Sequence, residues 1–395
     1  MITILLGLAL FAPAVGYVVF LQPSMAPGVV AFCLIHMGIG TRILLTMRWP
    51  RSRWLGAHVI MAYLLITIMR QQDGHYEKIA EMVALFLVYL AAWIHFEMLS
   101  RNEGHKVLKV FRQVCVVQCL VGFLGVVLPL GAIVGYAKFA KAVFPFAEPS
   151  HYALAAGPIL IVVGATSTPK VRLFLLMMAG ALALLLQSVV MLAFAILMCV
   201  IFFARARYLP FALVIIPGLI IGLIQNYSGL EYFTDRLDLV GSTNLTSLTY
   251  IQGWDDARRS LSYGYGFGTG FQSMGVLAPS ALSETIYSLS GQYLNRNDGS
   301  FVASKIISEF GIVGIVIVGF YLLFAFNALR FLNNCLNKSF DVFLLRRVIG
   351  ASLVVGFLPE MFFRGYGYFS PGVFMFFVGA FLFCDARRDR KVNNS

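Results

Sequence analysis

Residues 171–204 are the stretch that decides the fold class, and they read VRLFLLMMAGALALLLQSVVMLAFAILMCVIFFA. A helix crosses the hydrocarbon core of a bilayer with about 20 apolar residues, so this run is too long for a single crossing. The polar pair Gln187 and Ser188 interrupts it near its middle. The stretch therefore predicts two short membrane helices that are joined by a tight turn.

The same apolar character extends over the rest of the chain. Hydrophobic residues make up 59% of the sequence and charged residues 12%, whereas soluble domains have about 45–50% and about 25%. With the divided run, we expect an all-α polytopic membrane protein of about 12 transmembrane helices in a single domain, 1–395. The first apolar run of the chain, 2–21, is expected to be a membrane helix and not a cleaved signal peptide. The other apolar runs are 2–21, 25–47, 55–69, 79–99, 114–136, 152–166, 209–225, 303–328, 348–363 and 369–384.

The distribution of Lys and Arg predicts the orientation. Cytoplasmic connections of membrane proteins carry an excess of these residues. If the N-terminus is cytoplasmic, every connection on that side is basic, which also places the C-terminus in the cytoplasm. The net charge of +12 is then a topology signal and not a sign of nucleic-acid binding. The basic connections are 48–53, 101–112, 170–172, 205–207, 330–347 and 387–391.

Residues 226–302 form the one long hydrophilic connection, between the ninth and tenth predicted helices, and the orientation places it outside. Arg236 stands between Asp235 and Asp238, and Arg258 and Arg259 follow Asp256. Arginine suits phosphate because its planar fork donates two parallel hydrogen bonds. The alternative is an amphipathic surface helix with internal ion pairs.

Aromatic and glycine residues in the same connection suggest two further roles. Tyr250 and Trp254 are candidates to stack on sugar rings. The run Gly264-x-Gly266-x-Gly268-x-Gly270 has the wrong spacing for a nucleotide fingerprint, and it predicts a tight, close-packed turn.

A second outside cluster lies between the fifth and sixth predicted helices. Lys138 and Lys141 precede Glu148, Pro149 and His151. A carboxylate, an imidazole and two lysines at one membrane boundary could bind a phosphate or transfer a proton. The alternative is an ordinary helix start, with the hydroxyl of residue 150 as its cap and the carboxylate at the positive end of the helix dipole.

A third cluster leads into the tenth predicted helix. Arg296 and Asp298 precede it, and Lys305 and Glu309 lie four apart inside it, where we expect them to pair. Asp298 is a candidate base for a hydroxyl nucleophile, or else a helix cap.

Glu360 and Arg364 bracket the outside end of the eleventh predicted helix. An ion pair between them and a contact with a ligand are both open. The six histidines are scattered, so the sequence predicts no metal site and no cofactor.

Three short stretches resemble elements of the Wzy-type polysaccharide polymerases and their relatives, the O-antigen ligases. They are Glu148-Pro-Ser, Trp254-x-x-Ala followed by the glycine run, and Asn297-Asp298-Gly-Ser continued by Glu309-Phe-Gly-x-x-Gly. The layout, with one long outside connection late in the chain, is also similar. The histidine that precedes the Asn of the ligases is absent here, and this difference favours a polymerase.

The resemblance implies a metal-independent glycosyltransferase at the periplasmic face of the bacterial inner membrane, with residues 226–302 as the large periplasmic loop. It would join oligosaccharide repeat units carried on undecaprenyl pyrophosphate, and a chain-length regulator and a flippase are candidate partners. The implied catalytic residues are Glu148, Asp298 and His151. The implied substrate-binding residues are Arg236, Arg258, Arg259, Arg296, Trp254, Tyr250, Lys141 and Arg364.

Three other functions are compatible with this sequence. An O-antigen ligase has the same fold and donor but another acceptor. A transporter or flippase for lipid-linked sugar would carry its polar groups near the midplane, in repeated halves, whereas the polar candidates here gather at one interface. A non-catalytic subunit of an envelope assembly is the third.

Overall fold

A computed structural model describes residues 1–20, 24–46, 51–71, 74–128, 136, 139, 141–204, 230–239, 241–336 and 338–385, without the side chains of 51–54. In these ranges the chain is helical and has no strand, which confirms the all-α prediction. The helices are α1 (Ile2–Val18), α2 (Ala26–Ile39), α3 (Thr41–Thr46), α4 (Arg51–Met69), α5 (His75–Ser100), α6 (Gly104–Val127), α7 (Pro149–Ala165), α8 (Pro169–Leu185), α9 (Val189–Phe203), α11 (Glu231–Leu237), α12 (Leu245–Tyr263), α13 (Ala281–Ser290), α14 (Val302–Cys335), α15 (Val342–Gly356), α16 (Leu358–Phe362) and α17 (Pro371–Asp385).

The helices have the lengths and composition of a multi-pass membrane protein. Within the described ranges, four segments are long and apolar enough to cross a bilayer: α5, α6, α14 and the continuous stretch of α15 and α16. Six shorter apolar helices accompany them. The predicted span 209–225 lies outside the described residues, so the number of spans stays a prediction.

The break in the run 171–204 lies where the sequence predicts it. Helix α8 ends at Leu185 and α9 begins at Val189. Between them Gln187 has a positive φ of 50°, and the Ser188 side chain accepts a hydrogen bond from the Met191 amide at 3.2 Å. A side-chain N-cap of this kind satisfies one of the free amides of a new helix.

Contacts bring two of the predicted basic connections, 101–112 and 330–347, to one end of the bundle. Arg346 donates to the carbonyl of Asn102 at 3.1 Å, which joins the start of α15 to the turn between α5 and α6. Thr3, at the start of α1, donates to Gln113 of α6 at 3.0 Å.

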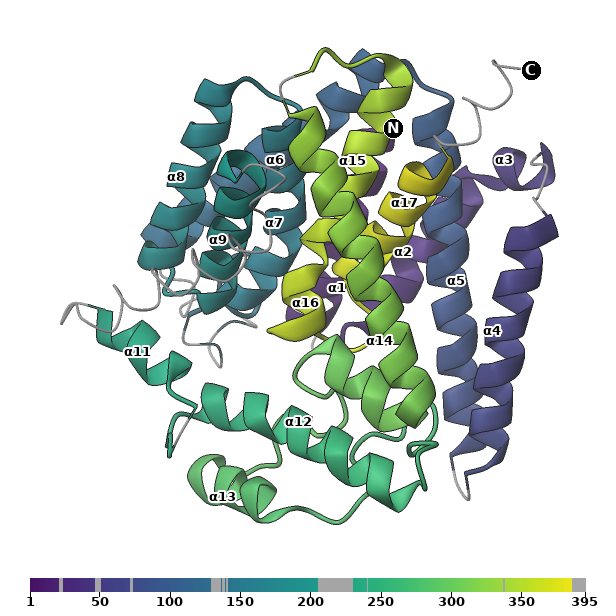
Figure 1. The fold of residues 1–395 in the computed structure, drawn as a ribbon, viewed down its shortest axis with the longest axis vertical. Coiled ribbons are helices and arrows are strands. Elements are labelled where there is room, and N and C mark those ends of the chain that lie inside the picture. The colour runs from purple at the N-terminus through teal and green to yellow at the C-terminus, as the bar shows by residue number, and fades with distance from the viewer. Residues whose placement is uncertain are drawn as a thin grey trace.

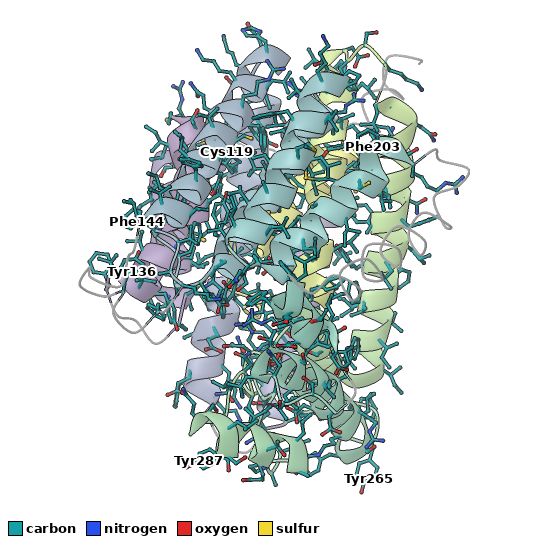
Figure 2. The ribbon with its side chains drawn as sticks, turned by 90° about the vertical axis from the view of Figure 1, so that its left-hand side faces the viewer. Cys119, Tyr136, Phe144, Phe203, Tyr265 and Tyr287 are labelled. Carbon is teal, nitrogen blue, oxygen red and sulfur yellow. The ribbon has the colours of Figure 1, made fainter. Side chains whose placement is uncertain are left out.

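Helices α11, α12 and α13 lie across the opposite end, at the bottom of Figure 1, while the N-terminus lies at the top. Figure 2 shows the same layer from the side, where Tyr265 and Tyr287 lie at the lower edge, far from Cys119. The side of the membrane on which each end lies stays a prediction.

Helix α7 is the centre of the bundle. It packs against α6, α9 and α15, and nearly all of its residues are buried. Helices α15 and α17 approach closely through glycine: a Cβ on Gly350 would lie 2.7 Å from the carbonyl oxygen of Gly379. Small residues at such crossings allow two backbones to pack directly, as is common in membrane helices.

Helix α14 is broken at Gly311, whose φ of 61° and ψ of −129° are not helical. The glycine-rich turn docks on this break. The amide of Ile312 donates to the carbonyl of Gly266 at 2.8 Å, and the amide of Gly270 donates to the carbonyl of Glu309 at 2.8 Å. The turn thus supplies hydrogen bonds at the break, and the close-packed turn that the sequence predicts is confirmed.

Candidate functional site

A cavity of about 710 Å³ opens at the end of the bundle that carries α11–α13. The first residues of α2, α5 and α7 contribute to its wall, and helix N-termini favour anions because their amides carry partial positive charge. The loop before α14 and the connection between α16 and α17 complete the wall. The charged and imidazole side chains that line it are Glu77, Lys78, Glu81, Glu148, His151, Asp298 and Arg364.

Glu148 and Arg364 form the central ion pair of this wall, although 216 residues separate them in the chain. The Nη2 of Arg364 lies 2.9 Å from the Oε1 of Glu148. The Nε2 of His151 lies 2.8 Å from the same oxygen, and the Ser150 hydroxyl also donates to it. Glu148 occupies the N-cap position of α7 with no side-chain capping bond, so the predicted cap by Ser150 is wrong.

The surroundings of Glu148 keep its carboxyl ionised. Burial acts to raise the pKa of this carboxyl, but the Arg364 charge, the contact with His151 and the hydrogen bond from Ser150 outweigh burial and lower the pKa to about 2. A carboxylate of this kind is a weak base at neutral pH. We therefore interpret Glu148 as the group that holds Arg364 in place.

His151 is buried against the aromatic ring of Tyr366, with ring centroids 4.2 Å apart in an edge arrangement. Its Nδ1 has no hydrogen-bond partner among the residues that the structure describes. The imidazole thus uses one nitrogen to orient Glu148 while the other is unpaired.

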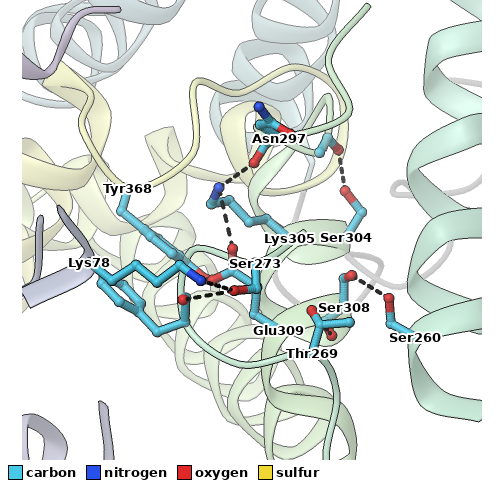
Figure 3. A network of polar contacts seen from close by, with 12 residues as sticks. Lys78, Ser260, Thr269, Ser273, Asn297, Ser304, Lys305, Ser308, Glu309 and Tyr368 are labelled. Carbon is cyan, nitrogen blue, oxygen red and sulfur yellow. Dashed lines mark hydrogen bonds and ion pairs between the residues drawn. The ribbon is translucent and has the colours of Figure 1, made fainter. Parts of the chain in front are cut away.

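Asp298 lines the cavity, and a buried ion pair supports the loop that carries it (Figure 3). Lys305 and Glu309 are almost fully buried and pair at 3.3 Å, which confirms the predicted pair. The Lys305 ammonium also donates to the carbonyl of Asn297, and the Tyr368 hydroxyl donates to Glu309 at 2.8 Å. The pair therefore holds the backbone next to Asp298, whose own carboxylate makes no hydrogen bond or ion pair within the described chain.

Three cavity residues at the start of α5 were not predicted from the sequence. Glu77, Lys78 and Glu81 all line the wall, and Lys78 donates to Ser273 at 2.8 Å. The available signal was Glu81, an ionisable residue inside the predicted span 79–99, because such residues are costly in a membrane and mark functional sites.

Arg236 of α11 and Lys141 do not line the cavity, but Arg236 lies within electrostatic reach of Glu148 and Arg364. The guanidinium carbon of Arg236 lies 3.9 Å from the ring centroid of Tyr232, and the Lys141 ammonium lies 4.7 Å from the same centroid. Burial lowers the pKa of Arg236, an effect that Glu148 opposes and Arg364 reinforces. The Nε of Arg236 has no hydrogen-bond partner among the described residues, so this cationic group has donor capacity for an anion.

The arginines of α12 and the loop after α13 do not line the cavity. Arg258 is 82% exposed and lies 3.9 Å from Asp255. Arg259 lies 3.5 Å from Asp256 and donates to a loop carbonyl. Arg296 likewise donates to the carbonyl of residue 277. This arrangement matches the alternative of a surface helix with internal ion pairs.

The two predicted sugar-stacking residues have another neighbour. The ring centroids of Tyr250 and Trp254 each lie 5.0 Å from that of Phe301. Both aromatics thus anchor α12 on the start of α14, outside the cavity wall.

Two remaining predictions concern Glu360 and Lys138. Glu360 is buried, and the ion pair of Arg364 is made with Glu148 instead, so the proposed pair between Glu360 and Arg364 is wrong. Lys138 lies outside the described residues.

Within the described part of the chain, no group of three or more His, Cys, Asp or Glu side chains is placed to hold a metal ion.

No protein-family model, no curated protein and no solved structure matches this chain. The likeness to polymerases and ligases is therefore carried by short motifs alone. What the protein does has to be argued from the cavity and its position at one end of an apolar bundle.

Proposed function

We propose that this chain is a polysaccharide polymerase, a glycosyltransferase that joins oligosaccharide repeat units carried on undecaprenyl pyrophosphate. The observation that carries the proposal is the cavity, in which Arg364, fixed by an ionised Glu148, shares a wall with the unpaired carboxylate of Asp298. A cation and a base at one end of a helical bundle suit a reaction on the polar head of a lipid-linked substrate.

We place the cavity at the periplasmic face of the bacterial inner membrane and both termini in the cytoplasm. The support is the distribution of charge, because the basic connections at positions 101–112 and 330–347 lie at the end opposite the cavity. In this orientation the repeat units react after they have crossed the membrane.

The leaving group of this reaction is a lipid pyrophosphate. The bond from the anomeric carbon of the growing chain to the pyrophosphate oxygen breaks, and its electron pair departs with that oxygen. Arg364 and Arg236 stabilise the developing negative charge. Positioned donors are effective because they need no reorganisation during the reaction, and the bonds to Glu148 give Arg364 that fixed position.

The acceptor is a hydroxyl of the incoming repeat unit. Its oxygen forms the new bond to the anomeric carbon, and Asp298 takes its proton. The buried pair of Lys305 and Glu309 positions the loop for this step. Tyr17, Tyr366 and Phe369 line the same cavity and can pack against sugar rings, which is the role predicted from the sequence for Tyr250 and Trp254.

The test is the surface polysaccharide of cells that lack the gene. We expect long chains to be lost while single repeat units accumulate on undecaprenyl pyrophosphate outside the cytoplasm. Full-length polymer that stays unattached would instead indicate a ligase, and repeat units trapped in the cytoplasm would indicate a transporter.

Complementation with point variants links this result to the arginines near the Glu148–Arg364 pair. Arg236→Ala removes an arginine within electrostatic reach of that pair and is expected to restore few long chains, whereas Arg258→Ala, which changes an exposed arginine that pairs with Asp255 on α12, should restore them fully. Full restoration by Arg236→Ala would remove Arg236 from the pyrophosphate site.

A further inference from the structure

A groove lies at the other end of the bundle, on the surface formed by α1 and α6. It is about 720 Å³ in volume. Its lining residues are Thr3, His105, Lys109, Arg112, Gln113, Val116 and Val117. We propose that this groove binds an anionic phospholipid, with the phosphate on Lys109 and Arg112 and an acyl chain along the lower part of α6.

The cationic part of the groove occupies one face of α6. His105, Lys109 and Arg112 follow one another at spacings of four and three residues, which places them on the same side of a helix. Lys109 and Arg112 carry like charges at this spacing, and such charges repel one another and destabilise the helix. A bound phosphate would remove that repulsion.

Lys109 and Arg112 are exposed and unpaired. Neither makes an ion pair or hydrogen bond within the described chain, whereas the neighbouring Lys106 lies 3.2 Å from Glu103. Among the lining residues, the imidazole of His105 lies 3.4 Å from the Glu103 carboxylate. Among the described residues no carboxylate lines the groove, so the surface there is complementary to an anion.

The face of α6 turns apolar directly below these cations. Val116 and Val117 are exposed, and the exposed apolar face continues through Leu120, Phe123 and Leu124. With a rise of about 1.5 Å per residue, Arg112 and Phe123 are about 16 Å apart along the helix. A cationic turn followed by this length of exposed apolar surface matches the phosphate headgroup and an acyl chain of a phospholipid. A free phosphate ion would bind the cations but would leave the apolar surface of α6 without a ligand.

The side chain of Gln113 closes the groove toward α1. It accepts a hydrogen bond from the Thr3 hydroxyl at 3.0 Å, which joins the two helices at the level of the cations. The site therefore has two walls, although most of its surface belongs to α6.

The test measures lipid binding to the purified full-length protein by native mass spectrometry. The probes are phosphatidylglycerol and phosphatidylcholine with identical acyl chains. We expect the wild-type protein to bind phosphatidylglycerol more tightly. The variant Lys109→Ala/Arg112→Ala should bind it about 30-fold more weakly, because each cation near an anionic lipid surface contributes on the order of 1 kcal/mol.

A charge-matched variant serves as the control. Lys106→Ala/Lys170→Ala also removes two exposed lysines outside the groove lining and should leave the affinity unchanged. Equal losses in the two double variants would show a diffuse attraction by the whole basic surface and would overturn the proposal. Equal binding of the two lipids would overturn it too, as would displacement of the lipid by millimolar inorganic phosphate. Size-exclusion profiles show whether each variant is folded.

Discussion

The cavity wall and helix α12 carry charged residues of the same kinds but pair them in different ways. In the cavity, Arg364 reaches across 216 residues to Glu148. On α12, Arg258 and Arg259 each pair with an aspartate three residues earlier. Neighbours on a helix surface meet without any help from the fold, so local pairs of this kind say little about function.

This contrast identifies the charged residues that mutagenesis should test. Fixing two long side chains from distant segments costs conformational entropy. The pair of Glu148 and Arg364 forms in spite of this cost because Ser150 and His151 also hold the Glu148 carboxylate in place. An exposed local pair contributes about 0–1 kcal/mol at most. If the comparison is correct, substitutions in the cavity will change polymer synthesis and equivalent substitutions on α12 will not.

The largest effect is expected from Asp298→Asn. The amide cannot take the acceptor proton, and loss of a general base lowers rates by about 10²–10⁴-fold. Long-chain polymer should disappear from the gel profile. Asp255→Asn on α12 is the control, because the exposed Arg258 is the one ion-pair partner of that carboxylate among the described residues. A normal chain-length profile with Asp298→Asn would exclude Asp298 as the base.

Arg364→Ala should follow, with a loss of about 10²–10³-fold, the usual cost of removing one donor to a developing charge. Arg364→Lys keeps the charge but loses the planar fork, so it should recover only part of the rate. The measurement is the rate of chain extension on lipid-linked repeat units. Equal losses from Arg364→Ala and the control Arg258→Ala would contradict the distinction between the two regions.

The fold class was largely predictable because the length and apolar character of the runs decide it. The helices of the bundle and the break at Gln187 and Ser188 follow from composition along the chain alone. The buried pair of Lys305 and Glu309 was predictable too, because both residues lie on one face of one helix. Local spacing is sufficient for each of these features.

The site was predictable only in part, because its wall comes from segments far apart in the sequence. Glu148, His151, Asp298 and Arg364 were identified as candidates by residue type and by their position at span ends. Nothing in the sequence pairs Arg364 with Glu148 in preference to the nearby Glu360. The same limit explains why Arg258 and Arg259 could not be separated from Arg236 before the structure placed them.

A smaller effect is expected at the junction that attaches the glycine-rich turn to α14. Gly311→Ala places a Cβ 2.0 Å from the carbonyl oxygen of Gly266, at a φ of 61°. Such strain costs about 1–3 kcal/mol, and Tm should fall by about 3–10 °C. Gly319→Ala in the same helix has nothing within 4 Å of its Cβ and should leave Tm unchanged. Equal Tm values for the two variants would show that the turn does not depend on this contact.

The smallest effect is the pH dependence of the Glu148 pair. A carboxyl with a pKa of about 2 in the folded protein and about 4.3 in the unfolded chain stabilises the fold above the unfolded value. That contribution disappears as pH falls through about 2. Because the Glu148 side chain is 39% exposed, water screens part of this contribution. The Tm of Glu148→Gln should therefore lie only about 2–4 °C below wild type at pH 7, and the gap should close between pH of about 4.5 and about 2. Glu103→Gln, whose partners are exposed, should show no gap at any pH. A Tm difference between Glu148→Gln and wild type that stays constant down to pH 2 would mean that the Glu148 side chain stabilises the fold through its packing and not through its charge.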